Sequence, residues 1–317
     1  MNEFYRPEGR LISLAENREY LSCEASLRKA AAEGKILESI ALYCEDRGEG
    51  KELIFNLGKI KGVMPKSEVE YSRTDEEPKD IAIITRVGKA VCFKITEFFE
   101  KDGKTVALLS RKEAQRECVD NFLSLLCPGD IIDATVTHME PFGAFMDVGC
   151  GIVSLMSIDC ISVSRISHPK DRFYTGMHIK AVVKSINYDN CRIYLTHKEL
   201  LGTWQENADA FSIGQTVSGI IRSIEPYGIF VELAPNLAGL AEYREDITSG
   251  TSAAVYIKNI IPEKMKIKLV IVDTFPAPDS KEKSFDYKIK SDNIEKWTYS
   301  PDSCNRIIET DFSENII

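Results

Sequence analysis

The stretch Glu140-Pro-Phe-Gly-Ala-Phe-Met-Asp-Val148 returns later in the chain as Glu225-Pro-Tyr-Gly-Ile-Phe-Val-Glu-Leu233. The two stretches lie 85 residues apart, and the match between their surroundings extends outward to Gly129 and Gly214. Self-similarity at a fixed spacing indicates a repeated structural unit. We therefore expect at least two copies of one small domain, with the quoted stretch at the same place in each.

Within each stretch, apolar and polar positions alternate as they do along a half-buried strand. Three apolar residues of the first copy share one face, which leaves Phe145 and Asp147 on the opposite, polar face. The second copy places Phe230 and Glu232 in the same way. One ring on a polar face is ordinary, but the same ring at the same position in two copies indicates a binding surface.

The composition is that of an ordinary globular protein, with 44% hydrophobic and 28% charged residues among 317. This length predicts about two or three domains. The nine cysteines include no Cys-x-x-Cys pair, so we expect reduced, buried thiols rather than disulfides or a metal site. No run approaches the ~18 consecutive apolar residues of a membrane span, and no apolar leader follows the first residue. We therefore expect a cytoplasmic protein that contacts no membrane.

The net charge of −9 argues at first against a nucleic-acid partner. The excess acid is concentrated, however, in residues 199–211, with three acids and no base, and in residues 273–317, with ten acids and six bases. The two matching units are balanced, with seven acids and seven bases in 128–198 and six of each in 212–272. This distribution predicts modest affinity for a polyanion rather than a tight electrostatic clamp.

Apolar spacing and Gly/Pro punctuation predict five short strands in each of three segments, and a helix over residues 16–33. The fold class is therefore mainly β: tandem five-stranded OB-fold barrels joined by short helices, with an N-terminal helix and a polar C-terminal tail. The expected parts are a helical segment (1–33), a first barrel (34–112), a helical linker (113–127), a middle barrel (128–198), a helical linker (199–211), a third barrel (212–273) and an acidic, loosely ordered tail (274–317) with one strand near 285–289.

Three motifs of the middle segment together resemble the S-one (S1) RNA-binding domain: Pro128-Gly129-Asp130 before an apolar strand, Pro141-Phe-Gly-Ala-Phe145 and Cys191-Arg-Ile-Tyr-Leu-Thr196. The third segment is similar with a shorter middle, and the first looks like a degenerate copy. The resemblance covers about two thirds of the chain. As a whole, the chain resembles the small S-one-like ribosomal proteins of low-GC Gram-positive bacteria.

The resemblance implies that single-stranded RNA binds across one face of a barrel. Matched by position, Phe142 and Phe145 are the stacking aromatics of the middle barrel and Arg192 is its basic residue. Tyr227 and Phe230 are the aromatics of the third barrel, and Lys266 is its basic residue.

Several family positions hold other residues. The family's histidine falls on Ser157 and Glu242, and its aspartate falls on Asn187 (or, with a gap, Asp189) and Ile261. A carboxylate at the histidine position predicts weaker RNA binding by the third barrel. In the first barrel the second aromatic position falls near Ile54, the arginine position falls on Val106, and no aromatic residue is expected to face outward. That barrel is therefore predicted to bind no RNA.

Aromatic rings hold unpaired bases in a sequence-tolerant way, because every base has a flat π face. The turn residues Phe142 and Tyr227 could instead close the barrel ends as hydrophobic caps. Basic residues supply contacts to phosphates. One set is a lysine ladder on the last strand of the third barrel: Lys264, Lys266 and Lys268. Its alternative role is a solvated edge that discourages aggregation.

A second basic set lies in an excursion of the middle segment, Ser162 to Tyr174, which could wrap RNA or form a solvated loop. Its candidate RNA-binding residues are Arg165, His168, Lys170 and Arg172. His138, His178 and His197 have no carboxylate or cysteine at ligand spacing, so neither a metal site nor acid–base catalysis is expected.

No nucleotide-binding loop, nucleophile elbow or paired-carboxylate motif is recognisable, so we expect a non-enzymatic protein without a cofactor. The predicted function is binding of single-stranded RNA or mRNA in translation or mRNA handling, with the small ribosomal subunit as a further partner. The alternative is a ribosome- or protein-docking scaffold with vestigial RNA binding.

Overall fold

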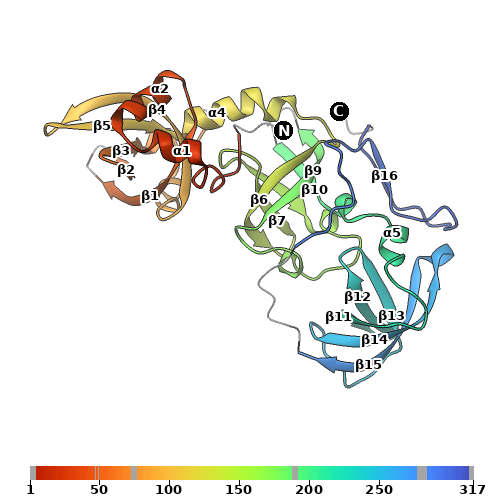
Figure 1. Ribbon diagram of the computed structural model, residues 1–317. Coiled ribbons are helices and arrows are strands. Elements are labelled where there is room, and N and C mark those ends of the chain that lie inside the picture. The colour runs from red at the N-terminus through yellow and green to blue at the C-terminus, as the bar shows by residue number, and fades with distance from the viewer. Residues whose placement is uncertain are drawn as a thin grey trace. The chain divides into compact units, whose positions relative to one another are not determined.

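The computed structural model describes residues 5–46, 48, 50–72, 77–187, 192–276 and 284–313 (Figure 1). The chain forms two compact units. The first contains the residues up to Leu126 together with Asp133–Thr135 and Asp147–Val153, and the second contains the remainder. Among the described residues, no helix has the length and apolar character that crossing a membrane requires.

Three closed five-stranded barrels dominate the structure and confirm the predicted fold class. In every barrel the strands follow the order first, second, third, fifth, fourth, so that the third and fifth strands pair in parallel. This is a five-stranded Greek-key barrel of the OB type. Alternating burial along the strands directs one row of side chains into each barrel core.

Each barrel contains the five strands that the sequence predicted for its segment. The first barrel consists of β1 (Leu37–Asp46), β2 (Lys51–Leu57), β3 (Ile60–Pro65), β4 (Ala90–Lys101) and β5 (Lys104–Ser110). The middle barrel consists of β6 (Ile131–Glu140), β7 (Gly143–Asp147), β8 (Val153–Ser157), β9 (His178–Asn187) and β10 (Arg192–Thr196). The third barrel consists of β11 (Thr216–Glu225), β12 (Gly228–Ala234), β13 (Leu237–Ala241), β14 (Ser252–Ile261) and β15 (Lys266–Phe275).

The N-terminal helix expected over residues 16–33 is instead two helices, α1 (Ala15–Tyr20) and α2 (Glu24–Ala32). The chain is extended at Cys23, where φ is −155° and ψ is 165°. The turn brings the Leu21 carbonyl against the β2–β3 turn, where a Cβ added at Gly58 would lie 2.8 Å from that oxygen. The break lets Leu27 of α2 pack into the core of the first barrel.

Each linker contains two separate helical pieces. The first contains α4 (Arg111–Asn121), whose start is capped by the Ser110 hydroxyl accepting a hydrogen bond from the Glu113 N–H, and η2 (Leu123–Leu125). The second contains η5 (Lys198–Leu201) and α5 (Trp204–Ala208). The remaining helical pieces are η1 (Lys66–Glu68), α3 (Asp80–Ile84), η3 (Ile158–Cys160), η4 (Pro169–Asp171) and η6 (Pro262–Lys264).

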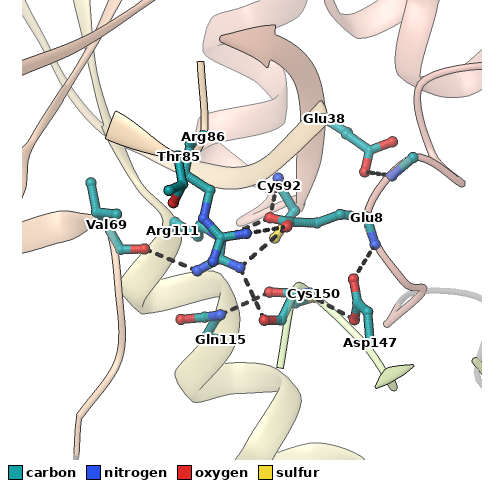
Figure 2. A network of polar contacts seen from close by, with 12 residues as sticks. Glu8, Glu38, Val69, Thr85, Arg86, Cys92, Arg111, Gln115, Asp147 and Cys150 are labelled. Carbon is teal, nitrogen blue, oxygen red and sulfur yellow. Dashed lines mark hydrogen bonds and ion pairs between the residues drawn. The ribbon is translucent and has the colours of Figure 1, made fainter. Parts of the chain in front are cut away.

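A buried polar network lies at the start of α4, within the first compact unit (Figure 2). The fully buried Arg111 donates to the Glu8 carboxylate at 2.7 and 3.2 Å and to the Gly151 carbonyl at 3.1 Å. The Glu8 N–H donates to Asp147 at 2.7 Å, and Asp147 also accepts from the N–H groups of Gly149 and Gly151. Asp147 is therefore buried, with an exposed fraction of 2%, and not on a solvated polar face as its alternation suggested.

The described part of the C-terminal segment, residues 284–313, is packed rather than loosely ordered. Two short strands, β16 (Lys296–Thr298) and β17 (Glu309–Asp311), pair with each other. Four large apolar side chains of the segment join the core shared by the third barrel and α5: Ile294, Trp297, Tyr299 and Phe312. These apolar residues are spread among polar ones, so the polar average composition of the segment predicted a loosely ordered tail.

The strand expected near residues 285–289 is absent from the described strands. Phe285 and Tyr287 instead pack their rings against His197, at centroid distances of 4.6 and 5.6 Å. The Lys288 N–H donates to the Leu200 carbonyl, which ties the segment to the second linker.

Candidate nucleic-acid interface

Each of the two repeated stretches forms a hairpin with an aromatic residue in the turn. Phe142 lies between β6 and β7, and Tyr227 lies between β11 and β12. The glycine after each ring permits close contact with the next strand: a Cβ at Gly143 would lie 2.4 Å from the Met156 carbonyl oxygen. The equivalent distance at Gly228, to the Ala241 carbonyl oxygen, is 2.6 Å. A larger residue at either position would displace the turn and its ring.

The two aromatic pairs have the same geometry. The Phe142 and Phe145 ring centroids lie 6.1 Å apart at an interplanar angle of 87°, and the same two values describe Tyr227 and Phe230. The turn rings are 56% and 69% exposed, so they do not close the barrel ends as buried caps. Phe145 and Phe230 are half-buried. Each edge-to-face pair therefore includes one ring that is more than half exposed.

His138 extends the aromatic surface of the middle barrel. Its ring stacks beside Phe145 at a centroid distance of 6.1 Å and an interplanar angle of 25°, and its Nε2 lies 2.6 Å from Glu140. In the third barrel the corresponding residue is Ser223, which pairs with Phe230 across β11 and β12. From the sequence, His138 was expected to have neither a metal-binding nor an acid–base role. Because His138 precedes Glu140 by two residues on an alternating strand, the sequence could have placed both side chains on the same face.

The lysine ladder of the third barrel has two members rather than three. Lys266 and Lys268 are exposed on β15 and alternate with buried Ile267. Lys264 belongs to η6, and the left-handed backbone at Met265, with φ at 48°, separates it from the strand. Lys264 is therefore not part of this row, because β15 begins at Lys266.

The strand register connects the remaining lysines to the rings. Phe230 pairs with Leu240 on β13, and Leu240 pairs with Lys268 on β15. Since directly paired residues of a sheet lie on the same face, an aromatic ring, an aliphatic side chain and an ammonium group form one row. In the middle barrel the last position of this row is occupied by Tyr194, which pairs with Leu155.

The other family positions of the two barrels vary in exposure. Arg192 is exposed at the start of β10, as expected. Ser157 is half-buried and its hydroxyl contacts the Cys160 thiol, while Glu242 is exposed beyond the end of β13. Asp189, the gapped alternative for the family's aspartate, lies outside the described residues.

The excursion from Ser162 to Tyr174 is neither a wrap for RNA nor a solvated loop along its whole length. Arg172 is only 3% exposed, and its guanidinium donates to Glu232 of β12 at 2.6 and 3.0 Å. It also donates to the Ser162 hydroxyl and the Pro235 carbonyl. Burial lowers the pKa of Arg172, whereas the Glu232 carboxylate favours its charged form. Arg172 is therefore a structural ion-pair partner and cannot contact a phosphate.

The other basic residues of the excursion differ from one another. The His168 side chain accepts a hydrogen bond from the Lys170 N–H at 3.0 Å and caps η4, so this nitrogen is already used. Lys170 is exposed, and the Arg165 side chain is 87% exposed. Arg165 and Lys170 are the members of this set that a phosphate could reach.

The corresponding face of the first barrel is covered by apolar side chains. Ile54, at the second aromatic position, is 2% exposed and packs with Val63, Val106 and Phe99. One expectation was wrong: Tyr43 of β1 pairs with Ile54 and is 48% exposed, so an aromatic ring does face outward there. It comes from the first strand, which the motif match did not include.

Comparison with known proteins agrees with this geometry. Residues 126–198 match the family model of the S1 RNA binding domain. The chain is 29% identical over 208 residues to the small ribosomal subunit protein bS1 of Staphylococcus aureus (strain COL), covering 61% of this chain and 52% of that protein. It is 26% identical over 257 residues to the bS1 homolog of Bacillus cereus (strain ATCC 10987 / NRS 248), covering 76% and 65%.

The chain thus resembles S1-domain proteins and spans about half the length of the Staphylococcus aureus relative. A solved structure from Streptococcus pneumoniae TIGR4, a multidomain protein with nucleic acid binding domains, is similar at 13% identity and a TM-score of 0.24. That match covers 78% of this chain and 75% of the other.

Proposed function

We propose that this S1-like chain binds single-stranded RNA without catalysis, through the outer faces of its middle and third barrels. The observation that carries the proposal is the exposed edge-to-face aromatic pair, present with the same geometry in two copies. An exposed ring held rigidly at a hairpin turn offers a flat surface for an unpaired base. Each stacked base contributes about 1–3 kcal/mol, with little dependence on base identity.

Charged side chains beside the rings would hold the phosphates. The proposed set for the middle barrel is Phe142, Phe145, His138 and Arg192, with Lys170 nearby; the set for the third barrel is Tyr227, Phe230, Lys266 and Lys268. Only a few of the described basic residues belong to these two sets, so stacking would supply most of the affinity. This agrees with the balanced charge of the two segments.

The relatives support a proposal for the biological setting. Two similar proteins are named as small ribosomal subunit proteins. We propose that this chain acts in translation or mRNA handling and that mRNA and the small ribosomal subunit are its partners.

Fluorescence anisotropy of the full chain tests the proposal. A labelled unstructured RNA of about 12 nucleotides, close to the site size of one or two OB folds, should bind more tightly than a duplex of the same sequence, because paired bases cannot stack on the rings. Equal affinity for both forms would show that only phosphates are recognised, and the stacking sites would be wrong.

A docking function is favoured by one observation on the first barrel. Its β1 exposes Ile40 and Leu42, and the neighbouring helix α3 exposes Ile81 and Ile84. Co-sedimentation with ribosomes after ribonuclease treatment separates the two functions. Loss of association supports RNA binding, and association that survives supports docking through protein.

A further inference from the structure

Arg165 of the middle barrel lies against the third barrel, within the same compact unit. Its guanidinium is 4.0 Å from the carboxylate of Glu225, the last residue of β11. Glu225 pairs with Gly228 at the base of the hairpin turn that carries Tyr227. The arginine therefore stands beside the aromatic pair of the third barrel, although the sequence places it in the middle barrel.

The strand register defines the face on which this contact occurs. Ser223 pairs directly with Phe230, so both side chains lie on the same face. Glu225 is two residues after Ser223 on the same strand and thus shares that face. Arg165 consequently contacts the third barrel on the face that exposes its rings.

The excursion that carries Arg165 is fixed at several points. The buried Arg172–Glu232 ion pair is one, and the Arg222–Asp171 ion pair at 3.1 Å is another. The Ser162 hydroxyl donates to the Pro235 carbonyl, and the Val163 N–H donates to Asn236 at 3.0 Å. This segment is held against the third barrel at both ends, which restricts where Arg165 can reach.

We propose that Arg165 completes the nucleotide site of the third barrel: the base stacks on Tyr227 and Phe230, and the adjoining phosphate of the single-stranded RNA is bound by the Arg165 guanidinium. This inference rests on the proposed function and reassigns Arg165 from the middle barrel to the third. A planar guanidinium suits a phosphate because its fork can donate two parallel hydrogen bonds. The existing pair with Glu225 is long and exposed, so it is weak and can be exchanged.

The middle barrel shows why the third barrel needs such a residue. Glu140 occupies the position of Glu225 and is paired with His138 from the same barrel. The third barrel has Ser223 in place of that histidine, so the histidine contact made by Glu140 has no counterpart at Glu225. Arg165 offsets the negative charge of Glu225 next to the path of the phosphates. The third site is thus composite, whereas the middle site is built from its own barrel.

A double-mutant cycle in the full chain tests the assignment, with anisotropy against the labelled single-stranded RNA. Arg165→Gln should weaken binding by about tenfold, the scale of a hydrogen bond to a charged group, and reduce the log–log salt slope by about 0.7. The loss should persist when Phe142→Ala and Phe145→Ala leave only the third site. It should fall below about twofold when Tyr227→Ala and Phe230→Ala remove that site, because coupled residues are non-additive.

Lys59→Gln, a matched loss of one exposed charge on the first barrel, should leave affinity unchanged, and thermal melting should be similar for all charge variants. An Arg165 effect that disappears only with Phe142→Ala and Phe145→Ala would overturn the reassignment. An effect of equal size in both backgrounds, or no loss at all from Arg165→Gln, would also overturn it. If Tyr227→Ala with Phe230→Ala costs no affinity, the third-barrel site fails together with the inference; if the unmodified chain binds no single-stranded RNA, the proposed function itself fails.

Discussion

The middle and third barrels carry the same aromatic pair but support it differently. In the middle barrel, His138 adds a third ring and pairs with Glu140, and Tyr194 ends the row across the sheet. In the third barrel those positions hold Ser223 and Lys268, and the equivalent glutamate is approached by Arg165. The repeated rings carry the function proposed for both barrels, and the residues around them differ between the two copies.

The acidic residues that follow the strand aromatics by two positions, Asp147 and Glu232, also have different surroundings in the two barrels. Asp147 is held by backbone N–H groups and belongs to the network of Arg111, whereas Glu232 is paired with Arg172 and Arg222. Both carboxylates are buried. The alternating pattern therefore suggested a polar face for both carboxylates, whereas both are buried and have structural roles.

The largest expected effect comes from Arg172, whose buried ion pair with Glu232 joins the two barrels. Arg172→Met should lower the free energy of unfolding by about 3 kcal/mol, because removing one partner of a buried pair leaves an under-compensated charge. The retained Arg222–Glu232 pair at 2.8 Å keeps the loss at the low end of the usual range. Urea denaturation followed by circular dichroism measures it, with the exposed Arg165→Met as the control. Equal midpoints for the two variants would show that the buried pair does not hold the excursion.

A histidine directly after the last strand of the middle barrel should make the stability of the protein depend on pH, and the third barrel has no such histidine. His197 is fully buried there, and burial lowers its pKa to about 3. The unfolded chain has the ordinary value of about 6.5 and takes up a proton that the folded chain does not. Stability should be complete above about pH 6.5 and fall as the pH approaches 3, by at most ~1.4 kcal/mol per pH unit. His197→Phe should flatten this part of the profile; superimposable profiles would contradict it.

The barrels and the rings were predictable because their signal is local. Period-two alternation placed Phe145 and Phe230 correctly, and a strand needs only its own residues to show that pattern. Arg172 was misassigned because its partner Glu232 is 60 residues away and nothing near Arg172 in the sequence reveals its burial. Lys264 was misassigned because the left-handed turn at Met265 is not visible in an alternating Lys-x-Lys-x-Lys run.

Single substitutions test whether the additional ring of the middle barrel strengthens RNA binding. Phe145→Ala should weaken single-stranded RNA binding by about 1–3 kcal/mol, the contribution of one stacked base, with little change in melting temperature. Phe230→Ala should cost less, since His138 has no aromatic counterpart in the third barrel. Tyr43→Ala, an exposed ring on the first barrel, should change nothing. A larger loss for Phe230→Ala than for Phe145→Ala would reverse the proposed order of the barrels.

The smallest expected effect is a change in salt dependence that should differ between Lys268 and Lys264 of the third barrel. Lys268→Gln should reduce the log–log salt slope by about 0.7, the value for one phosphate contact with a single strand. Lys264→Gln should leave the slope unchanged, because that residue lies off the strand. The middle barrel should contribute about two to four contacts to the slope of the whole chain. Equal effects of the two substitutions would mean that the charge acts through the general field and not through a defined track.

The most direct test removes both aromatic pairs at once. The full chain with Phe142→Ala, Phe145→Ala, Tyr227→Ala and Phe230→Ala should lose nearly all stacking-dependent affinity for a labelled single-stranded RNA, while its circular dichroism spectrum stays that of the unmodified protein. Anisotropy titrations of both proteins at the same salt concentration give the answer. A loss of at least 100-fold, about 2.7 kcal/mol at 1.36 kcal/mol per factor of ten, agrees with two stacking sites. Unchanged affinity in a folded variant would contradict the account.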